Sequence, residues 1–217
     1  MGRAAMRYTS SQAPRPFSAA FALVVTGLVF SGCTVPGMIA TGGATGGVAI
    51  AQERGPSAAI DDNAIAAEIN KRWLDHDWHI FRDVSTSVSE GRVMLTGKVA
   101  KPEDELAAVR LTWEVDGVRQ VYDEIQIGPD TGAFQYARDV WISTQMRADM
   151  TFDSEIKSIN YNIVTVDGVV HIFGIGQSQD EVERVERYAR NVPYVREVVT
   201  HVVMKDDPSR HAEAEKP

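Results

Sequence analysis

The stretch Ser89-Glu-Gly-Arg-Val-Met-Leu-Thr-Gly-Lys-Val99 decides the fold, because its pattern returns as Val166-Asp-Gly-Val-Val-His-Ile-Phe-Gly-Ile-Gly176. In both copies an acidic residue and a glycine precede apolar residues at alternate positions, and a second glycine follows six residues after the first. Asp-Gly beside alternating apolar residues is a strong signal for a β-hairpin with a two-residue turn. The sequence therefore predicts the same hairpin twice, with Gly168 lying 77 residues after Gly91.

The repeat extends outward from the hairpin to residues 64–127 and 141–204, at a constant offset and without gaps. Apolar residues recur about every four positions ahead of each hairpin, which is typical of one face of a helix. These residues are Ile65, Ile69 and Trp73 in the first copy, and Ile142, Met146 and Met150 in the second. Asp61 and Asp62 are expected to cap the first of these helices, because a carboxylate can accept hydrogen bonds from free N–H groups there.

A strand is expected on each side of the turn, then a second helix and a third strand. The second helix should start near Pro102 in the first copy and near Ser178 in the second, and acidic residues follow both positions. The remaining strands are predicted at 84–88, 118–127, 161–165 and 195–204.

The sequence thus predicts an α+β fold of two αββαβ domains, each a small three-stranded mixed sheet packed by two helices. We place the domains at residues 61–130 and 137–204, and we expect a disordered tail at 205–217 because it lacks an apolar pattern. A unit of about 65 residues buries a modest core. We therefore expect the two domains to stabilise one another by packing together.

Residues 1–32 resemble a bacterial lipoprotein signal peptide. These residues contain no acidic side chain, and three arginines precede an apolar stretch at Phe17–Phe30. The apolar stretch is too short to cross a hydrocarbon core about 30 Å thick. Ser31, Gly32 and Cys33 match the end of a lipobox, in which the cysteine is acylated and becomes the new N-terminus, although Phe30 departs from the usual leucine. The alternative is an ordinary secretory signal with a passive cysteine.

Residues 33–60 are rich in Gly, Ala, Thr and Ser, which predicts a flexible linker between Cys33 and the first domain. Thr34 is not the aspartate that retains many lipoproteins at the inner membrane, so the resemblance favours an outer-membrane location facing the periplasm. A soluble periplasmic protein is the alternative.

The charge of the chain excludes several classes of function. The 22 Lys and Arg less the three in residues 1–32 leave 19, against 30 Asp and Glu, so the remaining chain has a net charge of −11. A body this acidic is a poor partner for nucleic acid.

The sequence offers no metal or catalytic site. His76 and His79 lack the further ligands of a structural zinc site. Acidic pairs at helix starts are expected to stabilise the positive end of the helix dipole rather than to act in catalysis. We therefore expect no enzyme activity, no metal and no cofactor.

The paired hairpins, each followed by an acidic helix, resemble the BON domain, as does the Val115-Asp-Gly-Val118 segment followed by Val121. Tyr194 stands in the second copy where that pattern has glycine, so the turn is expected to differ there. Together with the lipobox, these features resemble the dual-BON outer-membrane lipoproteins. The resemblance implies a non-enzymatic protein that binds anionic phospholipid through its second BON domain and supports envelope integrity.

The family's membrane helix carries a W-I-x-T pattern followed by a basic residue, and the matching residues here are Trp141, Thr144 and Arg147. They lie at positions 0, 3 and 6 of the predicted helix, so they form a rough stripe. Asp139 and Asp149 on the same helix are expected to weaken its attraction to anionic lipid. Alternatively, Trp141 packs against the first domain. The alternative function for the protein is a periplasmic protein-binding or chaperone-like module that acts on other envelope proteins.

Overall fold

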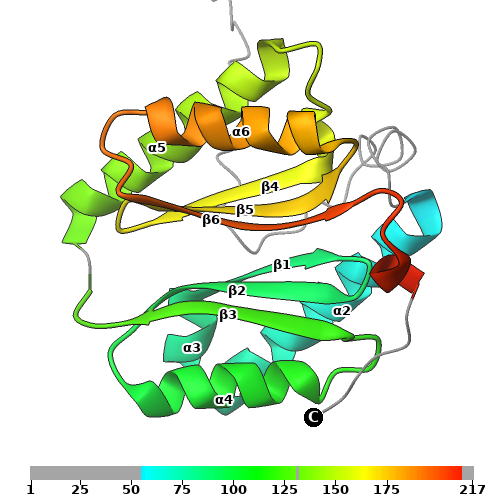
Figure 1. Cartoon of the computed structure of the whole chain (residues 1–217). Coiled ribbons are helices and arrows are strands. Elements are labelled where there is room, and N and C mark those ends of the chain that lie inside the picture. The colour runs from blue at the N-terminus through cyan, green and yellow to red at the C-terminus, as the bar shows by residue number, and fades with distance from the viewer. Residues whose placement is uncertain (1–54, 131, 212–217) are drawn as a thin grey trace, which may run out of the picture. The chain divides into compact units, whose positions relative to one another are not determined.

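The computed structural model describes residues 55–130 and 132–211 (Figure 1). The predicted signal peptide, Cys33 and most of the predicted linker lie outside the described residues. The described part confirms the predicted α+β fold: two repeats follow one another, and each has a three-stranded mixed sheet. The elements of the first repeat are α2 (Gly55–His76), α3 (Trp78–Asp83), β1 (Val84–Ser89), β2 (Arg92–Val99), α4 (Pro102–Trp113) and β3 (Gln120–Ile127).

The second repeat has the same order with a 3-10 turn in place of α3, and a further 3-10 turn follows it. Its elements are α5 (Gly132–Phe152), η1 (Ser158–Asn160), β4 (Tyr161–Val166), β5 (Val169–Gly176), α6 (Gln179–Asn191), β6 (Glu197–Met204) and the final η2 (Pro208–His211). The central strand of each sheet, β2 or β5, pairs antiparallel with the strand before it and parallel with the strand after α4 or α6.

Both hairpins turn as predicted. Glu90 and Gly91 have φ values of 55° and 71°, and Asp167 and Gly168 have φ values of 50° and 78°. Positive φ at both central residues is the signature of the type I′ turn, whose twist matches that of the flanking strands.

A buried carboxylate on the preceding helix holds each turn. In the first repeat, Asp62 accepts hydrogen bonds from the backbone N–H groups of Glu90 and Gly91 at 2.8 and 2.9 Å. The prediction that Asp61 and Asp62 cap the helix was wrong, because α2 begins at Gly55 and both residues lie inside it. In the second repeat, Asp139 holds its turn at the same two distances.

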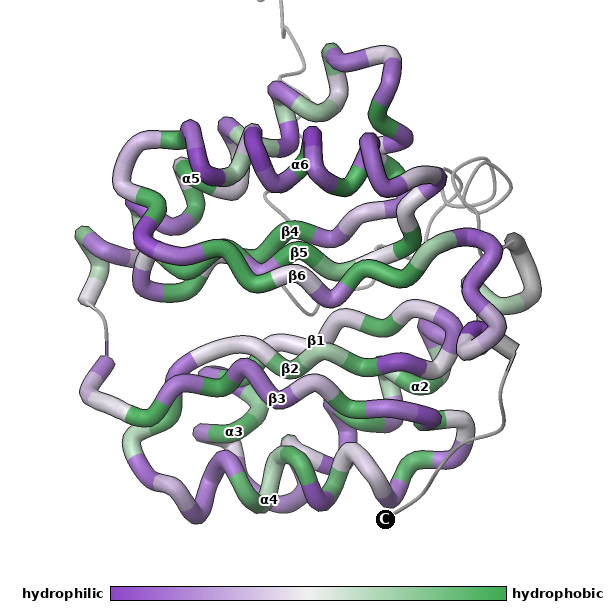
Figure 2. The backbone as a smooth tube through the Cα atoms, in the orientation of Figure 1, coloured by the Kyte–Doolittle hydropathy of each residue, from purple (hydrophilic) through white to green (hydrophobic). Residues whose placement is uncertain are grey.

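One face of each sheet is covered by the helices of its own repeat (Figure 1), and hydrophobic residues are frequent along the strands (Figure 2). The central strands β2 and β5 are buried along most of their length. The predicted helix-face residues of both copies are buried against the sheets: Ile65, Ile69, Trp73, Ile142, Met146 and Met150. The period of the apolar residues therefore identified the inner face of both long helices.

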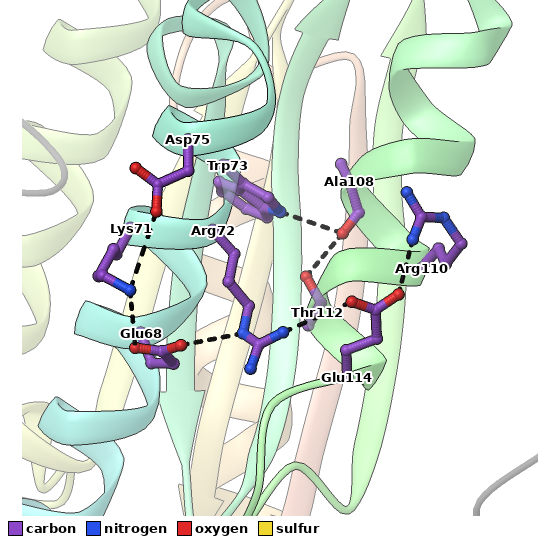
Figure 3. Close-up of polar contacts among 9 residues, drawn as sticks. All are labelled: Glu68, Lys71, Arg72, Trp73, Asp75, Ala108, Arg110, Thr112 and Glu114. Carbon is purple, nitrogen blue, oxygen red and sulfur yellow. Dashed lines mark hydrogen bonds and ion pairs between the residues drawn. The ribbon is translucent and has the colours of Figure 1, made fainter.

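Hydrogen bonds join α2 to α4 on the first repeat (Figure 3). The buried indole of Trp73 donates to the carbonyl oxygen of Ala108 at 3.1 Å, and the Thr112 hydroxyl donates to the same oxygen at 2.8 Å. Nearer the surface, Arg72 contacts both Glu68 and Glu114. The charged side chains on the outer side of α2 and at the end of α4 in the first repeat therefore pair with one another.

Side chains of the two repeats also contact one another. The Lys98 ammonium lies 2.6 Å from the Asp167 carboxylate, and the Asn162 amide donates to the Ser87 hydroxyl at 2.6 Å. The His201 Nε2 atom lies 2.6 Å from a Glu124 carboxylate oxygen. These three contacts are polar and part-buried, and the Tyr122 ring also contacts the rings of Phe173 and His201 across the repeats. Each repeat has a hydrophobic core of its own.

Two predicted boundaries need correction. The first helix begins at Gly55, inside the segment 33–60 that was predicted to be a flexible linker. The tail 205–217 was predicted to be disordered, but residues 208–211 form η2 and Arg210 is only 7% exposed. The Arg210 guanidinium forms an ion pair with Glu90 at 2.5 Å, a contact that spans 120 residues and that a local pattern does not reveal.

Candidate functional site

The cavity beside α2 is lined mainly by charged and small side chains. A cavity of about 840 Å³ borders α2 and the loop before β3, and acids, arginines and small residues line it. Its described lining contains no serine, threonine, cysteine or histidine. Arg72 already contacts Glu68 and Glu114, and Arg119 donates to the Ser209 carbonyl oxygen.

His79, in the segment after α2, belongs to a local helix cap. Asp77 caps α3 by accepting from the His79 backbone N–H at 2.7 Å, and its carboxylate lies 2.9 Å from His79 Nδ1. The backbone hydrogen bond from His79 is the main reason that the pKa of Asp77 is lowered. Within residues 55–130 and 132–211, no group of three His, Cys, Asp or Glu side chains could hold a metal ion.

Trp141 lies on the outer face of α5. Its side chain is 44% exposed, and its ring meets the ring of Tyr194 edge to face, with centroids 6.1 Å apart. A shallow hollow beside Trp141 is lined by Gln145, Asp149 and Tyr188 and by the loop at residues 191–193, all of them in the second repeat. The described residues therefore do not support the alternative prediction that Trp141 packs against the first domain.

The other two predicted site residues do not join Trp141 in one cluster. The exposed hydroxyl of Thr144 donates to the Val140 carbonyl oxygen at 2.8 Å, so it bonds within its own helix. The Arg147 guanidinium donates to the Ile163 carbonyl oxygen on β4. Burial of that guanidinium lowers the pKa of Arg147. Arg147 therefore lies toward the edge strand β4, whereas Trp141 lies toward the loop before β6.

A different cluster surrounds Trp141, and we call it the aromatic–arginine surface: Phe134, Arg138, Trp141 and Tyr194. The carbon at the centre of the Arg138 guanidinium lies 5.2 Å from the Phe134 ring centroid and 4.9 Å from that of Tyr194. Phe134 is 79% exposed and Tyr194 is 64% exposed. Exposed aromatic rings beside an arginine offer both apolar area and a positive charge.

Sequence reasoning found one of these four residues as a site residue. Arg138 and Phe134 lie one and two turns before Trp141, ahead of the matched pattern, and Tyr194 is about 50 residues away on a loop. The available signal was Tyr194 itself, which stands where the repeat has Gly117. Asp139, which was expected to weaken lipid attraction, is buried and accepts the two hydrogen bonds of its turn.

No helix among the described residues is both long enough and apolar enough to cross a membrane.

The fold and the surface define a class of protein: a tandem pair of small α+β domains, the second of which presents aromatic and basic side chains to solvent. Residues 61–129 and 138–206 each match the BON domain, and the chain belongs to the BON-domain family. The resemblance seen in the sequence is confirmed at this level.

Three relatives are similar over most of both domains. A protein of Anaplasma centrale, named "Uncharacterized protein in gshII 5'region", is 42% identical over 147 residues, which cover 67% of this chain and 96% of that protein. The outer membrane lipoprotein DolP of Haemophilus influenzae is 28% identical over 141 residues, covering 64% of this chain and 72% of DolP. The osmotically-inducible protein Y of Escherichia coli is 29% identical over 141 residues, covering 64% of this chain and 70% of that protein.

Proposed function

We propose that this chain is a non-enzymatic envelope protein that faces the periplasm, binds anionic phospholipid through its second BON domain and supports the integrity of the outer membrane. The observation that carries the proposal is the aromatic–arginine surface, which α5 and the loop before β6 form together. The relationship to an outer membrane lipoprotein and to an osmotically inducible protein supports the envelope setting.

The chemistry of this surface suits the boundary between lipid headgroups and acyl chains. Tryptophan and tyrosine have an apolar ring and one polar group. They are therefore stabilised at the membrane–water interface, where the ring contacts acyl chains and the polar group stays hydrated. The Arg138 guanidinium adds a positive charge and N–H groups that can donate hydrogen bonds to the oxygens of a lipid phosphate. The net charge of the chain opposes long-range attraction to an anionic surface, so the proposed contact acts at short range, within about 10 Å at 0.1 M salt.

The proposed acyl group on Cys33 would make a weak surface contact sufficient. A tether that holds the second domain near a bilayer raises its effective concentration there, and binding then needs little intrinsic affinity. Cys33 and the proposed signal peptide, residues 1–32, belong to this proposal together with the outer-membrane location. A soluble periplasmic form would have to bind by the aromatic–arginine surface alone.

A vesicle sedimentation assay tests the proposal on the unit spanning Thr34–Pro217, which contains all the described residues. We expect binding to vesicles of phosphatidylglycerol and phosphatidylethanolamine above binding to vesicles of phosphatidylcholine alone. Trp141→Ala should lower the affinity about tenfold, because an interfacial tryptophan that is truncated loses most of its buried area.

Phe152→Ala is the matched control, since Phe152 is an exposed aromatic residue at the far end of the same helix and should leave binding unchanged. Equal binding to both kinds of vesicle would contradict the lipid proposal. Such a result would favour the alternative, a protein-binding module, for which the cavity beside α2 offers a lined recess.

A further inference from the structure

The two repeats differ at three equivalent positions that meet in space. The first repeat has Asp61, Ala64 and Gly117, and all three line the 840 Å³ cavity beside α2. The residues 77 positions later are Arg138, Trp141 and Tyr194. The second repeat thus has three side chains of the aromatic–arginine surface where the first repeat has a hollow.

Tyr194 occupies its position in spite of an unfavourable backbone. Its φ is 72°, close to the 90° of Gly117, and this left-handed region is costly for a residue with a Cβ atom. The packing of a buried side chain does not explain the choice, because Tyr194 is mostly exposed and its ring contacts Trp141 and Arg138. Backbone strain that the core does not need is a pointer to function.

Arg138 is a cation without a carboxylate partner among the described residues. Its Nη1 atom donates to the Gln135 side chain at 3.1 Å, and the neighbouring Asp139 carboxylate accepts from Gln135 and from its own hairpin turn. Two of the three arginines of α6 differ, since Arg184 pairs with Glu155 and Arg190 pairs with Glu186; the third, Arg187, lies on α6 away from the aromatic–arginine surface. The remaining N–H groups of Arg138 are therefore available to an anion.

We propose that Arg138 and Tyr194 form the headgroup contact of this chain: Arg138 binds the phosphate of an anionic phospholipid, and the Tyr194 ring fixes the guanidinium and enters the interface beside Trp141. This inference rests on the proposed lipid-binding function. It replaces Thr144 and Arg147 as headgroup ligands, because the Thr144 hydroxyl bonds to Val140 and the Arg147 guanidinium bonds to the carbonyl oxygen of Ile163.

Tyr194→Gly tests the inference by moving two measurements in opposite directions. The substitution restores the residue type of Gly117 and removes the strained Cβ, so the urea midpoint of the Thr34–Pro217 unit should stay equal or rise. Binding to phosphatidylglycerol vesicles should fall about fivefold, as expected for an interfacial aromatic residue that also orients the arginine. A variant that loses stability and binding together would overturn the inference, since Tyr194 would then support the fold.

Substitutions of three arginines show whether vesicle binding depends on Arg138 itself or on positive charge in general. Arg138→Gln should lower vesicle affinity about fivefold, which is the effect of one basic residue near an anionic surface. Arg187→Gln is the control: Arg187 is exposed on α6 and the substitution removes the same charge, so affinity should change less than twofold. Arg147→Gln should also keep vesicle affinity, although its urea midpoint should fall.

The outcomes distinguish this inference from the proposed function. If the unsubstituted protein ignores phosphatidylglycerol vesicles, the proposed function fails. If it binds them but Arg138→Gln and Tyr194→Gly bind equally well, the function stands and the inference is wrong. Free inorganic phosphate at 10 mM, with ionic strength matched by chloride, should not displace the protein from vesicles. Displacement would show a site for free phosphate instead of a membrane contact and would overturn the inference.

Discussion

Asp139 belongs to the hairpin of the second repeat rather than to its outer surface. Its two carboxylate oxygens accept from the backbone N–H groups of Asp167 and Gly168, and it is almost fully buried. A turn with positive φ at both positions points two N–H groups in one direction, and a carboxylate can satisfy both. The hairpin therefore depends on one side chain from a helix 28 residues earlier in the chain.

Asp139→Ala should consequently destabilise the protein by about 2 kcal/mol, because hydrogen bonds to a charged group are lost and two N–H groups are left without partners. Urea unfolding followed by circular dichroism measures the change. Asp149→Ala on the same helix is the control, since that carboxylate has one exposed partner, Gln145. Equal losses for both variants would contradict the special role of Asp139.

At the scale of elements, patterns of about four residues and of two residues predicted most of the architecture. The paired hairpins, the inner helix faces and the start of α4 at Pro102 follow from local sequence, because each depends on neighbours within one or two turns. The short helix α3 did not follow, since its buried Ile80 gains its stability from the core of the first repeat. The early start of α2 and the 3-10 turn η2 were missed as well.

The candidate site was less predictable than the fold. A helical stripe gives the angles between Trp141, Thr144 and Arg147, but it does not say which neighbouring element each side chain meets. The β4 edge takes Arg147 and the loop before β6 brings Tyr194 to Trp141, and both depend on the completed fold. The site therefore needed the tertiary structure, and so did the choice between an exposed Trp141 and one packed against the first domain.

The start of α6 offers a test at this scale. Ser178 was predicted to begin this helix, and its hydroxyl oxygen accepts from the Glu181 backbone N–H at 3.2 Å as an N-cap. Ser178→Ala should cost about 1 kcal/mol of stability in urea unfolding, the usual effect of losing such a cap. Ser178→Asn keeps an acceptor and should recover most of the loss. If both variants unfold alike, the hydroxyl does not contribute as a cap.

At the scale of the whole described molecule, titratable groups meet where the two repeats contact each other. His171 on β5 is 2% exposed, and neither ring nitrogen has a hydrogen-bond partner among the described residues. The Glu124 carboxylate on β3 lies 3.6 Å from its Nδ1 atom, and the same carboxylate bonds to His201 on β6. Burial lowers the pKa of His171, and this outweighs the opposing attraction of Glu124 and Glu197.

Stability should therefore fall as the pH drops below about 6.5. The unfolded chain takes up a proton at His171 near pH 6.5, whereas the folded chain resists the same proton until a lower pH. Protonation then favours unfolding, so this contribution is complete above pH 6.5 and is lost through the acid range. Urea midpoints at pH 7.5 and 5.0 measure the slope, which His171→Leu should reduce. An unchanged slope in that variant would exclude His171 as its source.

Asp62 and Asp139 occupy equivalent positions, so each repeat can be compared with the other residue by residue. What the copies share, such as a helix carboxylate bonded to a hairpin turn, belongs to the common scaffold. A residue that differs between the copies, such as Gly117 in one and Tyr194 in the other, is not required by the common scaffold. Differences between the halves therefore indicate where to look for specialised roles.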